Sequence, residues 1–129
     1  MRLSAFLCTT VAAAAIAGGA AAHHSAVMVD HSRVLRLEGT VKAFDFASPH
    51  SWVAVIVKAK GIGETEWNLE GEDTVRLMRD GLTRDTLKPG DHITATIYPL
   101  HDGRPVGQLI NITAANGKTF GVTPMPTPR

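Results

Sequence analysis

Apolar residues recur at every second position over most of the chain from Arg33 onward, rather than with the 3.6-residue period of a helix. In the first such segment one side of the predicted strand is apolar and the other is charged or polar, as a half-buried strand requires. Its apolar members are Leu35, Leu37, Val41 and Ala43. Gly39 falls on the apolar side, where a glycine often marks a bulge or a sharp bend. The alternation therefore restricts this chain to a fold made mainly of short strands.

The same period predicts four more strands, at residues 51–60, 65–70, 93–98 and 110–114. The first of these is apolar on both faces. Turn-forming residues connect the segments, because proline presets φ and glycine adopts positive φ without strain. These turns are Gly61-Ile62-Gly63, Lys88-Pro89-Gly90-Asp91, His101-Asp102-Gly103 and Asn116-Gly117.

Between the third and fourth predicted strands the pattern changes to that of a short helix. Asp73 is placed to cap its N-terminus and Gly81 to end it. The spacing i, i+3, i+7 predicts an apolar face made of Val75, Met78 and Leu82.

Three strands, a helix and two strands follow one another in the order of an OB-type barrel, a five-stranded, partly open Greek-key barrel. We therefore predict an all-β fold with one short helix, in the form of a small OB-like open barrel (β-β-β-α-β-β). A glycine bend in a long first strand favours a barrel, since a strand shared by both sides of a small barrel must bend. A small sandwich and another kind of open barrel are the alternatives.

The N-terminal 22 residues have the pattern of a secretory signal peptide. Arg2 precedes an apolar run over residues 3–17, and small residues follow up to Ala22. The alternative is a membrane anchor, but the run is shorter than the roughly 20 residues that span a bilayer. Cleavage after Ala22 would make His23 the new N-terminus and would remove Cys8, the single cysteine. We expect a periplasmic or secreted protein with no stable membrane anchor after cleavage.

The predicted organisation has four parts: a signal peptide at 1–22, a His-containing segment at 23–32, an OB-like barrel domain at 33–120 and a proline-rich, disordered tail at 121–129. The full chain of 129 residues, with 13 basic and 12 acidic side chains, accommodates one ordinary domain. Cleavage would leave 12 of each sign. Neutrality argues against a nucleic-acid partner, since such proteins usually carry a basic excess. The oligomeric state stays open.

Histidine is the distinctive residue of the predicted mature chain, because two of the six histidines would begin it. A free N-terminal amine with neighbouring imidazoles suits Cu(II), which favours tetragonal nitrogen sites. We therefore consider copper as a cofactor, and the alternative is a solvated histidine pair without a metal. For His50 the alternative to metal binding is a structural role in a turn, in which its side chain hydrogen-bonds to the backbone while Trp52 fills the barrel mouth. The candidate metal ligands are His23, His24, His50 and His31.

Two tryptophans and a glutamate suggest a second kind of site. Trp52, Trp67 and Glu70 are candidates for a barrel face that binds a periplasmic protein partner or a small ligand. An enzyme with a metal or carboxylate site near Glu70, His50 and His101 is a further, less favoured hypothesis. The chain has no GxSxG, HExxH or phosphate-loop motif, and no catalytic residue is assigned.

Several short motifs together resemble an exported bacterial family known as domain of unknown function 6152. The resemblance implies a small periplasmic β protein and supplies neither an activity nor catalytic residues. The chain departs from the pattern at Ser48, where asparagine is expected, and at Val27-Met28-Val29, where an aromatic residue often follows the histidine pair. The motifs are His23-His24-Ser25, Leu37-Glu38-Gly39-Thr40-Val41, Pro49-His50-Ser51-Trp52, Trp67-Asn68-Leu69-Glu70, Leu87-Lys88-Pro89-Gly90-Asp91 and Asp102-Gly103.

Overall fold

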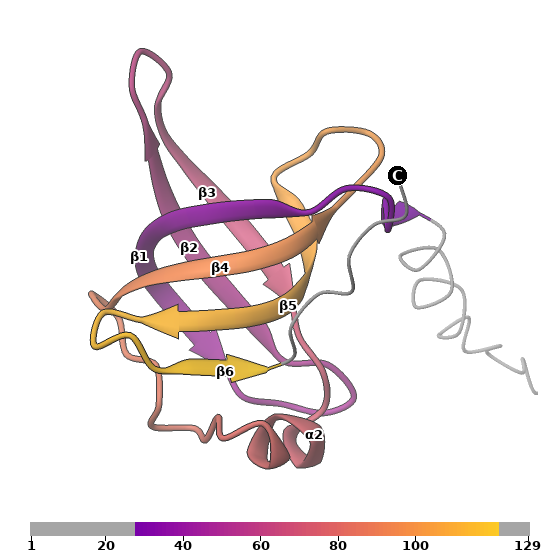
Figure 1. The fold of residues 1–129 in the computed structure, drawn as a ribbon, viewed down its shortest axis with the longest axis vertical. Helices are drawn as coiled ribbons and strands as arrows, with labels where there is room; N and C mark the ends of the chain where they lie inside the picture. The colour runs from indigo at the N-terminus through magenta and orange to yellow at the C-terminus, as the bar shows by residue number, and fades with distance from the viewer. Residues whose placement is uncertain (1–27, 122–129) are drawn as a thin grey trace, which may run out of the picture.

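The computed structural model describes residues 28–121, and strands dominate this part of the chain (Figure 1). The elements follow the predicted order, with one short strand added at the end. They are β1 (Leu35–Asp45), β2 (Trp52–Ala59), β3 (Gly63–Glu70), α2 (Thr74–Arg79), β4 (His92–Pro99), β5 (Val106–Ala114) and β6 (Thr119–Gly121).

Five of the strands close into a barrel. β2 pairs antiparallel with β1 and β3, and β4 pairs antiparallel with β1 and β5. A short parallel pairing of β3 with β5, in which Asn68 lies opposite Val106, closes the circle. The cyclic order β1-β2-β3-β5-β4 is that of an OB-type barrel, so the predicted fold class is confirmed. The added β6 pairs with the other half of β5 through a turn at Gly117, whose φ is +86°.

The long first strand bends as it passes from one barrel neighbour to the other. Its first half pairs with β4 and its second half with β2, and the register with β2 shifts between Val41 and Ala43. After this bulge, the residues of β1 lie on the opposite face from the one that simple alternation predicts, so that Ala43 is exposed and Phe44 packs against the core. The prediction that Ala43 faces the core is therefore wrong. The bulge lies beyond Gly39, where instead β1 lies so close to β2 that a Cβ atom would come within 2.5 Å of the backbone oxygen of Ile56.

The barrel interior is filled by aliphatic side chains from all five barrel strands. Alternate residues of each strand point inward, which is why the period-two pattern identified most of them. The aliphatic side chains with 0% or 1% exposure are Val41, Val53, Val55, Leu69, Ala95, Ile97 and Ile112.

Helix α2 begins and ends where the sequence predicts, but it buries a different face. The Asp73 carboxylate accepts a hydrogen bond from the backbone N–H of Arg76 at 2.8 Å and caps the N-terminus. Gly81, at φ +90°, reverses the chain after one and a half turns, and Leu82 donates to the Leu77 carbonyl at 2.8 Å.

Because the helix ends before Leu82, the i+7 spacing does not define one face. Leu77 and Leu82 are buried in the core, whereas Val75 and Met78 are 53% and 52% exposed. The predicted apolar face of Val75, Met78 and Leu82 is therefore wrong for two of its three members.

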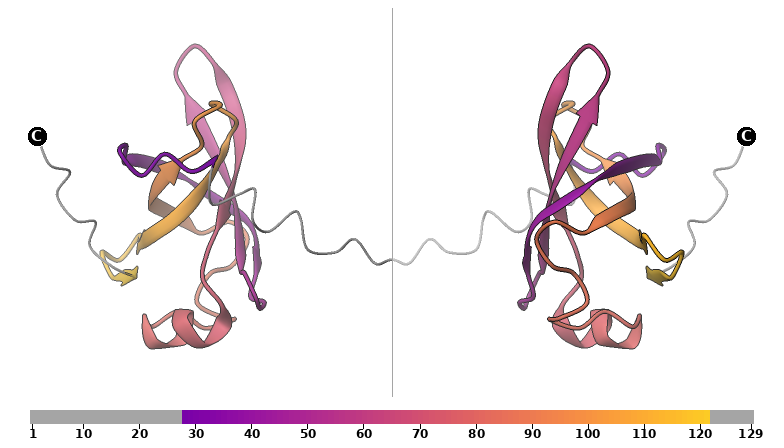
Figure 2. Two further views of the ribbon diagram at one scale, coloured as in Figure 1. Left: turned by 90° about the vertical axis from the view of Figure 1, so that its right-hand side faces the viewer. Right: turned by 90° about the vertical axis from the view of Figure 1, so that its left-hand side faces the viewer.

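The β2–β3 hairpin extends beyond the barrel, as Figures 1 and 2 show. Its two strands pair as far as Ala59 and Gly63, whereas β1 accompanies β2 only to Val57. Helix α2 lies beyond the opposite end of the barrel (Figure 2). Within residues 28–121 there is no helix with the length and apolar character that crossing a bilayer would need.

Candidate ligand-binding face

Four side chains from four successive strands follow one another around the outside of the barrel. Trp52 of β2 lies in register with Glu70 of β3, Glu70 with Gln108 of β5, and Gln108 with Tyr98 of β4. Residues in register on neighbouring strands present their side chains on the same side of a sheet. That side is the outer one, because the flanking residues Ser51, Val53, Leu69, Ile97, Pro99 and Gly107 are buried. We call Trp52, Glu70, Gln108 and Tyr98 the cross-strand row.

The side chain of His50 contacts Glu70, one of the residues of the cross-strand row. Its Nδ1 lies 3.3 Å from Oε1 of the carboxylate, with the imidazole side chain 47% exposed and the glutamate side chain 20% exposed. The predicted alternative for His50 was a backbone-bonded turn histidine beside a Trp52 that fills the barrel mouth. The contact that the structure records is with Glu70, and Trp52 stands on the outer face.

The loop that carries His50 is held by the buried Ser51. Its hydroxyl donates to the carbonyl of Ala47 at 2.9 Å and accepts the backbone N–H of the same residue at 3.1 Å. The Ser51 backbone also bonds to Glu72 and Gly71 at the end of β3, at 3.1 and 2.7 Å. These bonds fix the β1–β2 connection, with its cis Ser48–Pro49 peptide, against the strand that bears Glu70.

The side chain of His31 contacts two residues of the cross-strand row, Gln108 and Tyr98. Its Nε2 lies 3.0 Å from the Gln108 side-chain oxygen, and since a carbonyl oxygen only accepts, Nε2–H is the donor. Its ring also packs edge-to-face on Tyr98, with centroids 5.0 Å apart. A bridge between Val29 and Leu100 holds this N-terminal segment against the end of β4.

Asp30 and His101 form a separate pair beside this segment, with Asp30 Oδ2 3.7 Å from His101 Nδ1. Ser32 donates both its hydroxyl and its backbone N–H to the Asp30 carboxylate, and mainly the hydroxyl bond holds the pKa of Asp30 below its usual value. Of the three groups in the enzyme hypothesis, His50 and Glu70 are therefore in contact, whereas the recorded partner of His101 is Asp30.

The remaining candidate residues have different positions. Trp67 lies opposite Val55 and packs against the core, so the two tryptophans occupy opposite sides of the sheet. His23 and His24 lie outside the described residues. Over residues 28–121 no cluster of three histidine, cysteine or acidic side chains has a geometry that could hold a metal ion.

Sequence reasoning missed Gln108 and Tyr98. Tyr98 lies on a predicted strand and Gln108 lies two residues before another, but their place beside Glu70 depends on the parallel contact of β3 with β5, which joins segments far apart in the chain. No local pattern marks that contact.

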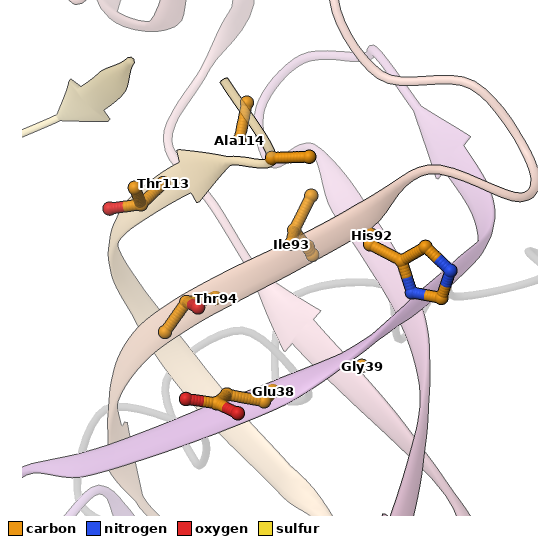
Figure 3. Close-up of a pocket in the computed structure, with 8 residues that line it drawn as sticks. Glu38, Gly39, His92, Ile93, Thr94, Thr113 and Ala114 are labelled. Carbon is orange, nitrogen blue, oxygen red and sulfur yellow. The ribbon is translucent and has the colours of Figure 1, made fainter. Parts of the chain in front are cut away.

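A hollow of about 310 Å³ lies elsewhere on the surface, between β1, β4 and the end of β5 (Figure 3). Glu38, His92, Thr94 and Thr113 supply its polar side chains, and His92 Nδ1 lies 3.3 Å from the Thr40 hydroxyl. None of the candidate residues from the sequence lines it. The hollow is lined by no tryptophan, tyrosine or phenylalanine, whereas at the cross-strand row a tryptophan lies beside a carboxylate.

The closed five-stranded barrel with its added strand defines the chain as a small β-barrel protein of OB type. The chain belongs to the DUF6152 family, a family of unknown function, whose model matches residues 11–109. No match was found among curated proteins or among solved structures. Family membership thus supplies no activity, and the function has to be inferred from the residues of the candidate face.

Proposed function

We propose that the protein is an exported binding protein, periplasmic or secreted, whose ligand contacts the cross-strand row. The observation that carries this proposal is the placement of Trp52, which is 38% exposed and lies beside the His50–Glu70 pair. An exposed indole offers a large, rigid apolar surface, and the adjacent imidazole and carboxylate are polar groups that can fix a ligand's orientation.

The fold supports the same location by analogy. OB-type barrels commonly bind ligands on the face of their second and third strands, beside the loops that follow strands one and four. Trp52 and Glu70 lie on these strands, and His50 lies in the loop after β1. An analogy of fold supports a location and does not identify a ligand.

The export part of the proposal rests on the signal-peptide pattern of residues 1–22. Mass spectrometry of the protein recovered from the periplasm or the medium would test it. We expect a chain that begins at His23. An intact chain that stays in the cytoplasm would contradict export.

The two tryptophans provide a direct test of the binding face, because a ¹⁵N-labelled sample gives two indole N–H signals. Trp52→Phe and Trp67→Phe variants assign them. We would titrate the protein with sugars, amino acids, nucleosides and organic acids as separate probes. The proposal expects a binding probe to shift the Trp52 indole signal more than the Trp67 signal. Binding that moves only Trp67, or residues around His92, would overturn it.

Copper binding at the N-terminal histidines is a second proposal, and it is supported by the histidine pair that would begin the mature chain. Such a site would draw on His23 and His24, with His31 or His50 as a further ligand. Cu(II) titration followed by EPR on protein with a free N-terminal His23 would test it. Unchanged copper binding by the double variant His23→Ala, His24→Ala would contradict it.

A further inference from the structure

The hollow of Figure 3 continues into a second hollow of similar size, and the two form one groove along the start of β4. Their volumes are about 310 Å³ and about 300 Å³, at the lower end of the range for ligand sites, which suits a small and narrow ligand. Glu38 lines the first hollow and Asp91 the second. The residues that line both are His92, Ile93, Ala114 and Ala115. We call this surface the β4 groove.

Apart from His92, the ionisable side chains of the β4 groove are acidic. Among residues 28–121, no lysine or arginine lines either hollow. The Glu38 carboxylate has no hydrogen-bond or ion-pair partner in this part of the chain, and Arg36, on the same side of β1, lines neither hollow. Asp91 accepts the Lys88 backbone N–H at Oδ2, at 2.9 Å, and this bond brings no cation to the carboxylate. The groove therefore attracts cations and repels anions.

The two carboxylates lie towards opposite ends of the groove. Glu38 is opposite Thr94 in the β1–β4 pairing, and Asp91 precedes Thr94 by three residues. Asp91 continues the pairing, because its carbonyl accepts the Val41 N–H at 2.8 Å. Three residues of a strand span about 10 Å and one strand-to-strand step adds about 5 Å at right angles, so the two backbones are about 11 Å apart. Of the four residues common to the two hollows, all but His92 are apolar.

We propose that the β4 groove binds a linear diamine, a diammonium ion with one charged group at each end of a methylene chain. One ammonium group donates to the Glu38 carboxylate and the other to the Asp91 carboxylate. The methylene chain packs on the apolar side chains between them, Ile93 and Ala114. This site is separate from the cross-strand row and takes a different class of ligand, so the proposal goes beyond the proposed function.

Other ligands fit the β4 groove less well. A phosphate or carboxylate would meet two acids and no basic side chain. A quaternary ammonium ion is recognised by aromatic rings, and neither hollow is lined by a tryptophan, tyrosine or phenylalanine. In the described part of the chain no three histidine, cysteine or acidic side chains are arranged to hold a metal ion. A monoamine would leave one of the two carboxylates without a cation.

The test is an NMR titration of the ¹⁵N-labelled mature protein with propane-, butane-, pentane- and hexanediamine as separate probes. Butylamine is the matched monoamine, and butanediol is the uncharged analogue. We expect a diamine to shift the backbone signals of Glu38, His92 and Thr94 and to leave the Trp52 indole signal unmoved. It should bind about threefold or more tightly than butylamine, the size of effect expected from one partly exposed ion pair. Raising the salt concentration from about 20 mM to about 0.2 M should weaken binding.

Variants of the two carboxylates test the residues directly. Glu38→Gln and Asp91→Asn should each weaken diamine binding by about threefold or more, and the double variant by about tenfold. Asparagine at position 91 keeps a side-chain oxygen that can accept the Lys88 N–H, so the turn is preserved. Glu72→Gln is the matched control, because it removes the same charge from an exposed residue that lines neither hollow. It should bind the diamine as the unmodified protein does.

Several results would overturn the proposal. If butylamine binds as tightly as every diamine, the contact with two carboxylates is wrong. If Glu72→Gln weakens binding as much as Glu38→Gln does, the diamine responds to the overall charge and not to the groove. A diamine that shifts Trp52 and not Glu38, or no binding by any diamine at about 10 mM and low salt, would also overturn it. None of these results contradicts the proposed function, because the cross-strand row and the β4 groove share no residue.

Discussion

Replacing Gly39 with alanine should destabilise the barrel at the point where β1 leaves β4 for β2. A Cβ atom at Gly39 would lie 2.5 Å from the backbone oxygen of Ile56 and 2.6 Å from Cγ1 of Val55. The backbone oxygen belongs to β2 and cannot turn aside as a side chain can. The two strands must therefore move apart at the centre of the barrel.

Two opposing effects set the magnitude of this change. Overpacking of a tightly packed site costs typically about 1–3 kcal/mol. Alanine also restricts the unfolded chain, which stabilises the folded state by about 0.4–1 kcal/mol. We expect a net loss of about 1–2 kcal/mol in the free energy of unfolding, which lowers Tm by roughly 5–15 °C for a domain of this size.

Urea unfolding and thermal melting, followed by circular dichroism at neutral pH, measure both quantities. Gly71→Ala is the matched control, because its Cβ would lie 3.6 Å from the nearest heavy atom, the Ser51 oxygen. Its stability should change by less than about 1 kcal/mol in either direction. Equal stability of Gly39→Ala and the unmodified protein would refute the close approach of β1 and β2.

Three further predictions concern the helix cap, the barrel core and a titrating carboxylate. Asp73→Ala removes the bond to the Arg76 N–H and should lower stability by about 1 kcal/mol in urea unfolding, whereas Asp73→Asn should retain most of it. Leu69→Ala creates a cavity at a fully buried position and should cost about 2–5 kcal/mol in the same assay. The hydrogen bond from Ser32 lowers the pKa of Asp30 in the folded state below its usual value of 3.8. The ionised Asp30 carboxylate therefore stabilises the fold fully at pH values above 3.8. This contribution is lost as the pH falls through the lower pKa of the folded state. Asp30→Asn should therefore be less stable than the unmodified protein at pH 7, and the difference should shrink in strong acid; a difference that grows on acidification would contradict this account.

Local patterns were sufficient to predict the five barrel strands, the helix caps and the fold class, but not the short β6. Alternation identified core residues such as Val55 and Ile97, since a strand's side chains alternate between its two faces. The cap at Asp73 and the reversal at Gly81 follow from residue chemistry within one turn of chain. The same local reasoning failed where the regular backbone repeat of a strand or helix is interrupted. The bulge after Val41 inverts the face of β1, and the early end of α2 leaves Met78 exposed.

The candidate site could be predicted only in part. Trp52, Glu70, His50 and His31 were chosen for their chemistry, and the structure places all four at or beside the cross-strand row. The placement of Gln108 between Glu70 and His31 follows from the closure of the barrel by β3 and β5. That closure joins residues about forty positions apart, which is a contact that a single sequence does not encode locally.

The measurement that tests the central claim most directly is a residue-by-residue NMR titration of the ¹⁵N-labelled mature protein with whichever sugar, amino acid, nucleoside or organic acid binds most tightly. We expect the largest shifts at Trp52 and at the neighbouring Glu70 and His50. Thr94, in the hollow of Figure 3, should not move. Shifts concentrated around Glu38, His92 and Thr94, with the Trp52 indole unmoved, would contradict the claim that the ligand binds at the row.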